Sequence, residues 1–91
     1  MYSLEPTPYE TGLQIAQRHR AMRKRLKISQ QEMAERSGVS LGSLKRFENS
    51  GKISLESLLK LVHLLGRLSD FDHVLKEGEN PDDIEKLFTN K

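Results

Sequence analysis

Apolar residues recur three or four positions apart along most of the chain, which is the spacing of an amphipathic helix. This spacing predicts five helices, at residues 12–26, 29–37, 41–48, 55–65 and 68–76. The strict alternation of apolar and polar residues that marks a half-buried strand is missing from the sequence. The pattern therefore predicts an all-α fold of five helices, with a short sixth helix to follow near the C-terminus.

The ends of the predicted helices carry local signals. Ser29 and Glu32 fit a capping box, in which each side chain accepts a hydrogen bond from the other residue's backbone N–H. Gly38 suits the left-handed conformation that ends many helices, and Ser40 is a typical residue for the start of the next helix. Residues 29–48 are thus predicted to form two short helices joined by a tight turn.

The helical spacing also selects the side chains expected in the core. His19 lies on the apolar stripe of the first helix, so we expect it to pack in the core. His63 and His73 are far from it in sequence, and without cysteines no paired metal ligands are present. No metal site and no cofactor are predicted. The expected core positions are Ile15, His19, Met22, Leu26, Met33, Ala34, Val39, Leu44, Phe47, Leu58, Leu59, Val62 and Leu65.

The chain divides into three segments by composition. Residues 1–11 hold two prolines without periodicity and are expected to form a flexible arm. Residues 12–76 are expected to form the helical domain, and residues 77–91 an acidic C-terminal segment. In that segment Asn80-Pro81-Asp82-Asp83 is typical of a helix start. The sixth helix would dock through the apolar residues that follow, Ile84, Leu87 and Phe88.

The charge of the chain is distributed unevenly. Up to Leu68 there are 12 Lys and Arg against 6 Asp and Glu, whereas from Ser69 onward there are 3 against 7. A basic region suits a polyanionic partner, although chance clustering on a solvated surface is the alternative. Two short helices with a tight turn form the helix-turn-helix, which lays its second helix in the major groove of DNA. Together these features favour DNA binding.

Composition argues against several other classes of function. The 91 residues contain no cysteine, which excludes disulfides and thiolate chemistry and suits a reducing cytoplasm. No apolar run approaches the roughly 18 residues of a membrane span, and the N-terminus lacks the order of a signal peptide. No nucleophile with a base, no paired acid and base and no phosphate-binding glycine loop is recognisable. We expect a cytoplasmic protein that is not an enzyme.

Several motifs at matching spacing resemble the lambda-repressor and Cro-like (XRE-type) helix-turn-helix domains. They are Met22-Arg23-Lys24, Ile28-Ser29-Gln30-Gln31-Glu32-Met33-Ala34, Ser37-Gly38-Val39-Ser40 and Phe47-Glu48-Asn49. The resemblance covers about residues 13–68 and implies a five-helix, lambda-repressor-like DNA-binding domain. Residues 40–48, followed by Ser54-Leu55-Glu56-Ser57-Leu58-Leu59, are also similar to short regulators paired with Hip-type kinase toxins. That similarity implies an antitoxin with a toxin protein as partner.

The predicted DNA interface lies at the start of residues 29–37 and along residues 41–48. If Leu44 and Phe47 are buried, the other side of their helix is turned outward, and Arg46 is expected to bind guanine O6 and N7. By resemblance, Gln30 contacts the DNA backbone. An ordinary solvated helix face is the alternative for the charged residues. The predicted contacts are Ser29, Gln30, Gln31, Ser40, Leu41, Gly42, Ser43, Lys45, Arg46 and Asn49.

The resemblance also implies a structural ion pair. In repressors of this shape an arginine of the first helix pairs with a glutamate late in the third, and Arg23 and Glu48 stand at the matching positions. We expect the pair to be partly buried and to fix the angle of the recognition helix.

Two functions of different class remain open. The first is a sequence-specific transcriptional repressor that binds an inverted repeat in double-stranded DNA as a homodimer. The second is a protein-binding module on a helix-turn-helix scaffold, which the apolar Leu41 and the small Gly42 would suit. The spare apolar residues Phe71, Leu75, Leu87 and Phe88 would form a dimer surface or, alternatively, close the core of the monomer.

Overall fold

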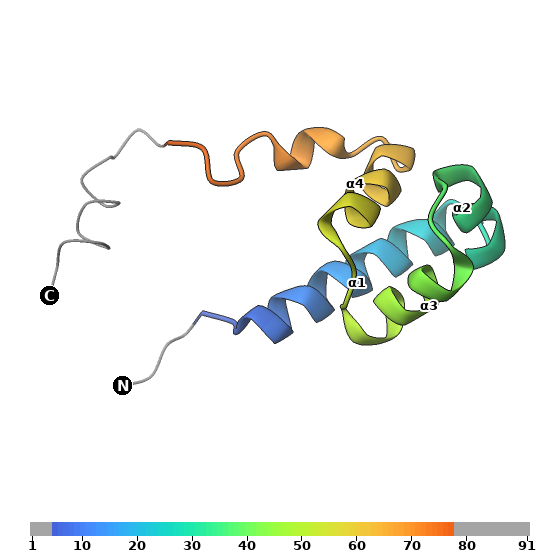
Figure 1. Cartoon of the computed structure of the whole chain (residues 1–91), viewed down its shortest axis with the longest axis horizontal. Helices are drawn as coiled ribbons and strands as arrows, with labels where there is room; N and C mark the ends of the chain where they lie inside the picture. The colour runs from blue at the N-terminus through green and yellow to red at the C-terminus, as the bar shows by residue number, and fades with distance from the viewer. Residues whose placement is uncertain (1–4, 78–91) are drawn as a thin grey trace, which may run out of the picture.

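Residues 5–77 are described in a computed structural model (Figure 1). Within them the chain is all-helical and contains no strand. Helix α3 packs against α1 and α2, while α4 packs against α2 and the final turn η1. The elements are α1 (Pro8–Arg25), α2 (Gln30–Ser37), α3 (Leu41–Ser50), α4 (Leu55–Leu64) and the 3-10 turn η1 (Leu68–Phe71).

Helix α1 begins at Pro8, four residues earlier than predicted, so that residues 8–11 of the expected arm are helical. The side chain of Thr7 accepts a hydrogen bond from the Glu10 N–H at 3.1 Å, and the Glu10 carboxylate accepts one from the Thr7 N–H at 2.9 Å. This complete capping box satisfies two of the free donors of the first turn. Pro8 needs no partner there, since the first helical position tolerates a missing N–H.

The predicted helix ends are largely confirmed. Ser29 and Ser40 accept hydrogen bonds from backbone N–H groups three residues on, and Gly38 ends α2 at a φ of 80°. The capping box predicted at Ser29 is only half formed. Glu32 instead pairs with Arg36 one turn later, at 3.3 Å, so its carboxylate is drawn along the helix.

Helix α3 extends two residues beyond the predicted Glu48, because Gly51 rather than Asn49 ends it. Gly51 adopts a φ of 79° and its N–H binds the Phe47 carbonyl. The turn lies directly against the first part of α1: a Cβ at Gly51 would come within 2.7 Å of the Gly12 carbonyl carbon. Glycine at position 51 therefore serves both the left-handed turn and a close approach of two backbones.

Among residues 5–77, seven apolar residues form the buried core, and the sequence predicted five of them. The two that it missed are Ala16 and Leu61, both fully buried. Helix α4 is apolar on most of its surface, so spacing alone did not show which side faces inward. The structure turns Leu61 into the core and leaves the predicted α4 core residues half-buried. The core is Ala16, Met33, Ala34, Val39, Leu44, Phe47 and Leu61.

The buried side of α1 also differs from the predicted stripe. It carries Ala16, His19 and Arg23, whereas Leu26 of the predicted stripe is 54% exposed. The burial of His19 and Arg23 agrees with the prediction, and both side chains contact Glu48 across the core. Ala16 was missed because the predicted stripe passed through Ile15 and not through Ala16.

The predicted helix at residues 68–76 is wrong, because only the single turn η1 forms there. Leu75 adopts a left-handed φ of 57° and is fully exposed, and Val74 is 56% exposed. A segment of this length gains little from being helical when its apolar side chains stay exposed. The predicted sixth helix lies outside the described residues.

Candidate nucleic-acid interface

Helices α2 and α3 meet through the three-residue turn Gly38-Val39-Ser40. The left-handed Gly38 reverses the chain, and Val39 inserts into the core with only 4% of its surface exposed. The Val39 N–H donates to the Ser37 hydroxyl at 3.1 Å, so the turn leaves little backbone unpaired. The turn fixes α3 against α2, which is the geometry of a helix-turn-helix.

Helix α3 is divided cleanly into an inner and an outer side. Leu44, Phe47 and Glu48 are buried. A Cβ built at Gly42 would meet nothing within 4 Å, so the space over the first turn is open. The outer side carries most of the predicted DNA contacts as exposed residues, namely Gly42, Ser43, Lys45, Arg46 and Asn49. A rod with one anchored side and one cationic, open side can enter a groove of DNA.

Three predicted contacts at the start of α3 also make contacts within the protein. Leu41 is half-buried and packs against the core, so that only part of it faces solvent. The hydroxyls of Ser40 and Ser43 bind each other at 2.8 Å. These three residues hold the start of α3 in place, through the core contact of Leu41 and the hydrogen bond between the two serines.

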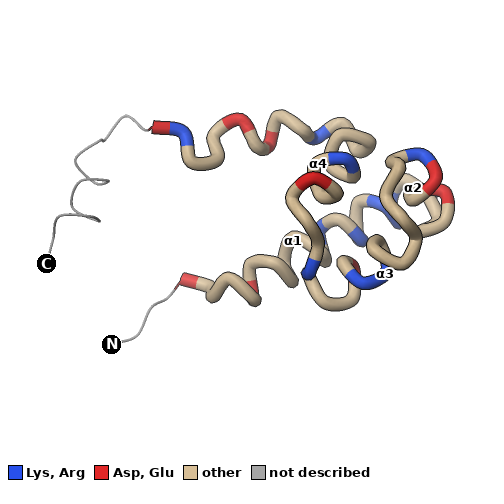
Figure 2. Tube along the Cα trace, viewed as in Figure 1, with Lys and Arg blue, Asp and Glu red and all other residues tan. Residues whose placement is uncertain are grey.

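The start of α2 presents a second part of the interface. Ser29 and Gln31 are exposed, and Gln30 is half-buried. The first N–H groups of a helix lack intrahelical partners and carry a partial positive charge, which suits a phosphate. In Figure 2, basic residues gather on the second half of α1, on α3 and on the turn after it, while the segment after α4 carries acidic ones.

Sequence reasoning missed a hollow of about 230 Å3 between α3 and the start of α4. Arg46 and Lys52 bring two cations to it, and the Ser54 hydroxyl caps α4 by accepting from the Ser57 N–H at 3.1 Å. The available signal was a lysine two residues before a serine cap, which places a cation beside a helix start. The hollow is lined by Ser43, Arg46, Lys52, Ile53, Ser54 and Ser57.

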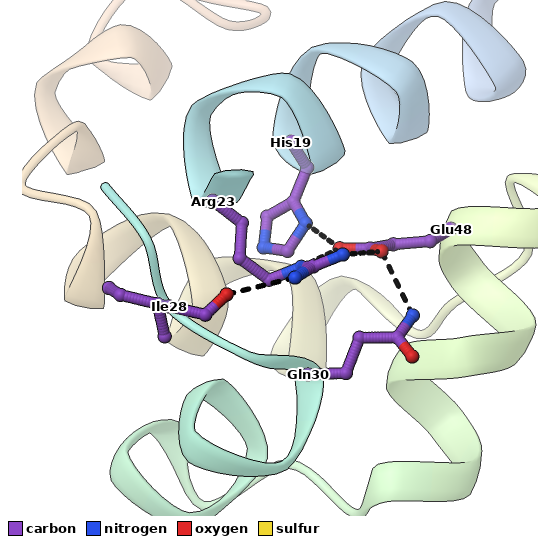
Figure 3. A network of polar contacts seen from close by, with 5 residues as sticks. All are labelled: His19, Arg23, Ile28, Gln30 and Glu48. Carbon is purple, nitrogen blue, oxygen red and sulfur yellow. Dashed lines mark hydrogen bonds and ion pairs between the residues drawn. The ribbon is translucent and has the colours of Figure 1, made fainter. Parts of the chain in front are cut away.

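A buried polar network holds α3 from behind (Figure 3). Glu48 Oε2 accepts from Arg23 Nε at 2.8 Å and contacts His19 Nδ1 at 2.8 Å. Its Oε1 accepts from Arg23 Nη2 at 2.8 Å and from Gln30 Nε2 at 3.0 Å. Arg23 Nη1 also donates to the Ile28 carbonyl at 2.9 Å. One carboxylate thus links α1, the start of α2 and the end of α3.

The network gives Gln30 a role that the sequence did not indicate. Its amide has two donor hydrogens, of which the Glu48 carboxylate takes one. The side chain predicted to contact the DNA backbone is therefore oriented by the same carboxylate that holds α3. The partners are 18 residues apart in the chain, so no local pattern could reveal the contact.

A family model of helix-turn-helix proteins matches residues 20–71, which is more than half of the chain. The chain belongs to the XRE-type helix-turn-helix family. It is accordingly a DNA-binding transcription regulator. No curated protein and no solved structure matched it. The match includes α2 and α3 whole, together with the second part of α1 that supplies Arg23.

Between residues 5 and 77 the regulator has neither a cluster of metal-binding side chains nor a membrane-spanning helix. No group of three or more His, Asp and Glu residues there lies close enough to hold a metal ion. None of the helices between residues 5 and 77 is long and apolar enough to cross a membrane.

The titration of the buried network follows from its geometry. Burial lowers the pKa of His19, because it disfavours the imidazolium more than the Glu48 carboxylate favours it. Burial acts to raise the pKa of Glu48, but hydrogen bonds from Arg23 and Gln30 and the charges of Arg23 and His19 bring it below its usual range. Since a carboxylate only accepts, His19 carries its proton on Nδ1 when neutral.

These shifts predict that acid destabilises the regulator in two stages. A lowered pKa means that the unfolded chain takes up the proton first as the pH falls. The His19 contribution is therefore complete above a pH of about 6.5 and is lost below it, and the Glu48 contribution is lost below about 4.3. Urea unfolding between pH 8 and 5 should show the first decline. His19→Leu should remove that decline, whereas His63→Gln, at an exposed site, should keep it; an unchanged decline in the leucine variant would refute the assignment.

Proposed function

We propose that the regulator is a sequence-specific repressor that binds an inverted repeat as a homodimer. The observation that supports this proposal is the division of α3, whose buried side is held by Leu44, Phe47 and Glu48 while its outer side exposes Lys45 and Arg46. A recognition helix needs both properties, because a helix that moves loses the fixed geometry on which base contacts depend.

Each part of the interface takes a distinct role. Arg46 reads a guanine through its planar fork, and Gly42 lets the helix start come close to the bases. Lys45 and Asn49 contact phosphates, as do Gln30 and the backbone N–H groups at the start of α2. Phosphate contacts set the position on the duplex, and base contacts supply the specificity.

The hollow before α4 extends the proposed backbone contact. Lys52 and the capped start of α4 stand beside Arg46, and a phosphate seated there would meet a cation and free N–H groups together. The starts of α2 and α4 would then contact the DNA phosphate backbone on either side of the groove that α3 enters.

Binding to the DNA upstream of the regulator's own gene tests the function. We expect a shifted band in a gel-shift assay, and an affinity that falls steeply with salt because each neutralised phosphate releases counterions. The logarithm of the affinity should fall by about 0.9 per phosphate contacted for each tenfold rise in salt. The absence of a shift at any salt, with a folded protein, would contradict the proposal.

Arg46→Ala tests the proposed base contact. We expect a loss of about 1–3 kcal/mol on the specific site, with relaxed preference at one base pair. Fluorescence anisotropy on the site and on its single-base variants measures both effects. Lys45→Ala, on the same exposed side, should weaken binding to all these duplexes alike. If Arg46→Ala also weakens all of them equally, Arg46 contacts phosphate only.

The setting of the repressor is proposed from resemblance. Residues 40–48 and 54–59 are similar to Hip-type antitoxins, so we infer that the regulator controls its own operon in the cytoplasm and neutralises a kinase toxin. The two half-sites of a homodimer would lie about 10 base pairs or a multiple of this apart. Co-purification of the toxin encoded by a neighbouring gene, with loss of its kinase activity, is the expected result; a neighbour without kinase activity would contradict the inference.

A further inference from the structure

A groove of about 540 Å3 lies between α1, α4 and η1. Its floor is apolar, and its border is basic on balance: Arg18 and Arg25 line it together with Arg67, which pairs with Asp70 of the same border at 2.9 Å. Buried His19 also lines it, and no partner for its Nε2 is present among residues 5–77. The apolar floor, half-buried in the described chain, consists of Ile15, Met22, Leu58, Val62, Leu65 and Phe71.

The groove is separate from the DNA interface. None of its lining residues belongs to α2 or α3. Helix α1 turns Ala16 and Arg23 toward the core and presents Ile15 and Met22 to the groove. A partner bound in the groove would therefore leave the outer side of α3 free to bind DNA.

The C-terminal residues 78–91 have the composition that this groove would accept. Leu87 and Phe88 follow Ile84 by three and four residues, a spacing that would place all three on one side of a helix. Around them stand four acidic residues, Glu79, Asp82, Asp83 and Glu85. With Lys86 counted, the stretch from Glu79 to Phe88 remains acidic, by four acidic residues against one basic residue. An apolar ridge in an acidic stretch complements an apolar floor whose border is basic on balance.

The described chain leaves the helical domain after η1 (Figure 1). Beyond η1, residues 72–77 run away from α4 and from the other helices (Figure 1). Val74 and Leu75 are exposed along this path, so residues 72–77 do not pack on the helices of their own domain. We propose that residues 78–91 of one copy dock in the groove of a second copy, and that the two copies exchange these segments reciprocally.

Such an exchange makes a symmetric dimer in which each contact occurs twice. The exchange rests on the proposed homodimer, but it does not depend on any of the proposed DNA contacts. A chain that dimerises in this way but binds no DNA would refute the repressor and leave the exchange intact. A monomer that binds single half-sites would refute the exchange and leave the proposed DNA binding intact.

Sedimentation equilibrium of the full chain tests the apolar part of the contact. The wild-type chain should be a dimer, and Leu87→Asp should weaken dimerisation at least about tenfold, since a carboxylate would have to leave water for an apolar floor. Thr89→Asp adds the same charge beside the apolar ridge and should leave the dimer largely intact. A wild-type monomer, or an unaffected Leu87→Asp dimer, would overturn the proposal.

Charge reversal tests the border of the groove. Arg18→Glu together with Arg25→Glu should weaken the dimer, whereas Arg20→Glu, exposed on α1 outside the groove, should have a smaller effect. All three sites are exposed, so the fold should persist, which circular dichroism can verify. Equal effects of the groove and control variants would show that general charge, and not this groove, governs association.

A mixture of isotope-labelled and unlabelled full-length chains shows whether residues 78–91 dock in the groove of a second copy or in the groove of their own chain. Isotope-filtered nuclear Overhauser effects between chains should connect Leu87 and Phe88 to Met22 and Val62. If those contacts appear only within one chain, the segment occupies its own groove and the exchange is refuted. If the dimer forms without any of these contacts, another surface joins the two copies.

Discussion

Glu48→Ala should cost the regulator about 3–5 kcal/mol of folding free energy, because it removes one partner of a buried ion pair and leaves the other charged. Arg23 is only 7% exposed and would keep only its hydrogen bond to the Ile28 carbonyl. His19 and Gln30 would lose their acceptor as well. Since small domains are stable by about 5–15 kcal/mol, this one change should remove a large part of the total.

Urea unfolding followed by circular dichroism measures this loss. Glu35→Ala, at an exposed site on α2, is the matched control and should change the free energy by less than about 0.5 kcal/mol. Replacing both Arg23 by Met and Glu48 by Leu should cost less than Glu48→Ala alone, since no buried charge is then left unpaired. A double variant less stable than the single one would contradict this explanation.

Gly51→Ala should be the most damaging of the glycine substitutions. At a φ of 79° an L-residue costs about 1–2 kcal/mol. In addition the new Cβ would stand 2.7 Å from the Gly12 carbonyl carbon and 2.8 Å from the Leu13 nitrogen. Backbone atoms cannot turn aside as a side chain can, so α1 must shift, and overpacking adds about 1–3 kcal/mol.

Gly38→Ala provides an internal control for this prediction. Gly38 has nearly the same φ, 80°, but a Cβ there would meet nothing within 4 Å. The Gly38→Ala variant should therefore lose only the folding free energy that an L-residue costs in the left-handed conformation. Thermal and urea unfolding of the two variants isolate the contribution of the close approach between Gly12 and Gly51. Equal losses would mean that α1 accommodates the methyl group freely.

Features set by neighbouring residues were the most predictable from sequence. The serine caps and Gly38 depend on hydrogen bonds and φ values within four residues, and the prediction placed them correctly. The start of α1 had the same kind of signal, Thr7 with Glu10. It was overlooked because the prolines at 6 and 8 suggested an irregular arm, although proline suits a first helical turn.

Features set by distant contacts were predicted less well. Leu61 could not be distinguished from its apolar neighbours on α4, because which side is buried depends on where α2 lies. The predicted helix at residues 68–76 had the right spacing, but only the turn η1 forms there, and Val74 and Leu75 stay exposed. The spacing of apolar residues indicates which segments could form an amphipathic helix. Whether a short helix forms depends on burying its apolar side against other parts of the fold.

The candidate site divides in the same way. The exposure of Lys45 and Arg46 followed from the spacing of Leu44 and Phe47 on one helix. The bond from Gln30 to Glu48 and the place of Lys52 beside Arg46 join different elements, so only the fold could bring them together. The predicted roles of the DNA-contacting residues remain predictions.

Selection of bound duplexes from a pool of random DNA tests most directly whether the outer side of α3 reads sequence. We predict that the wild-type regulator enriches an inverted repeat with half-sites about 10 base pairs, or a multiple of this, apart. Arg46→Ala should lose the enrichment of one guanine in each half-site while keeping the others. A folded wild-type protein that enriches no motif even at low salt would contradict the central claim.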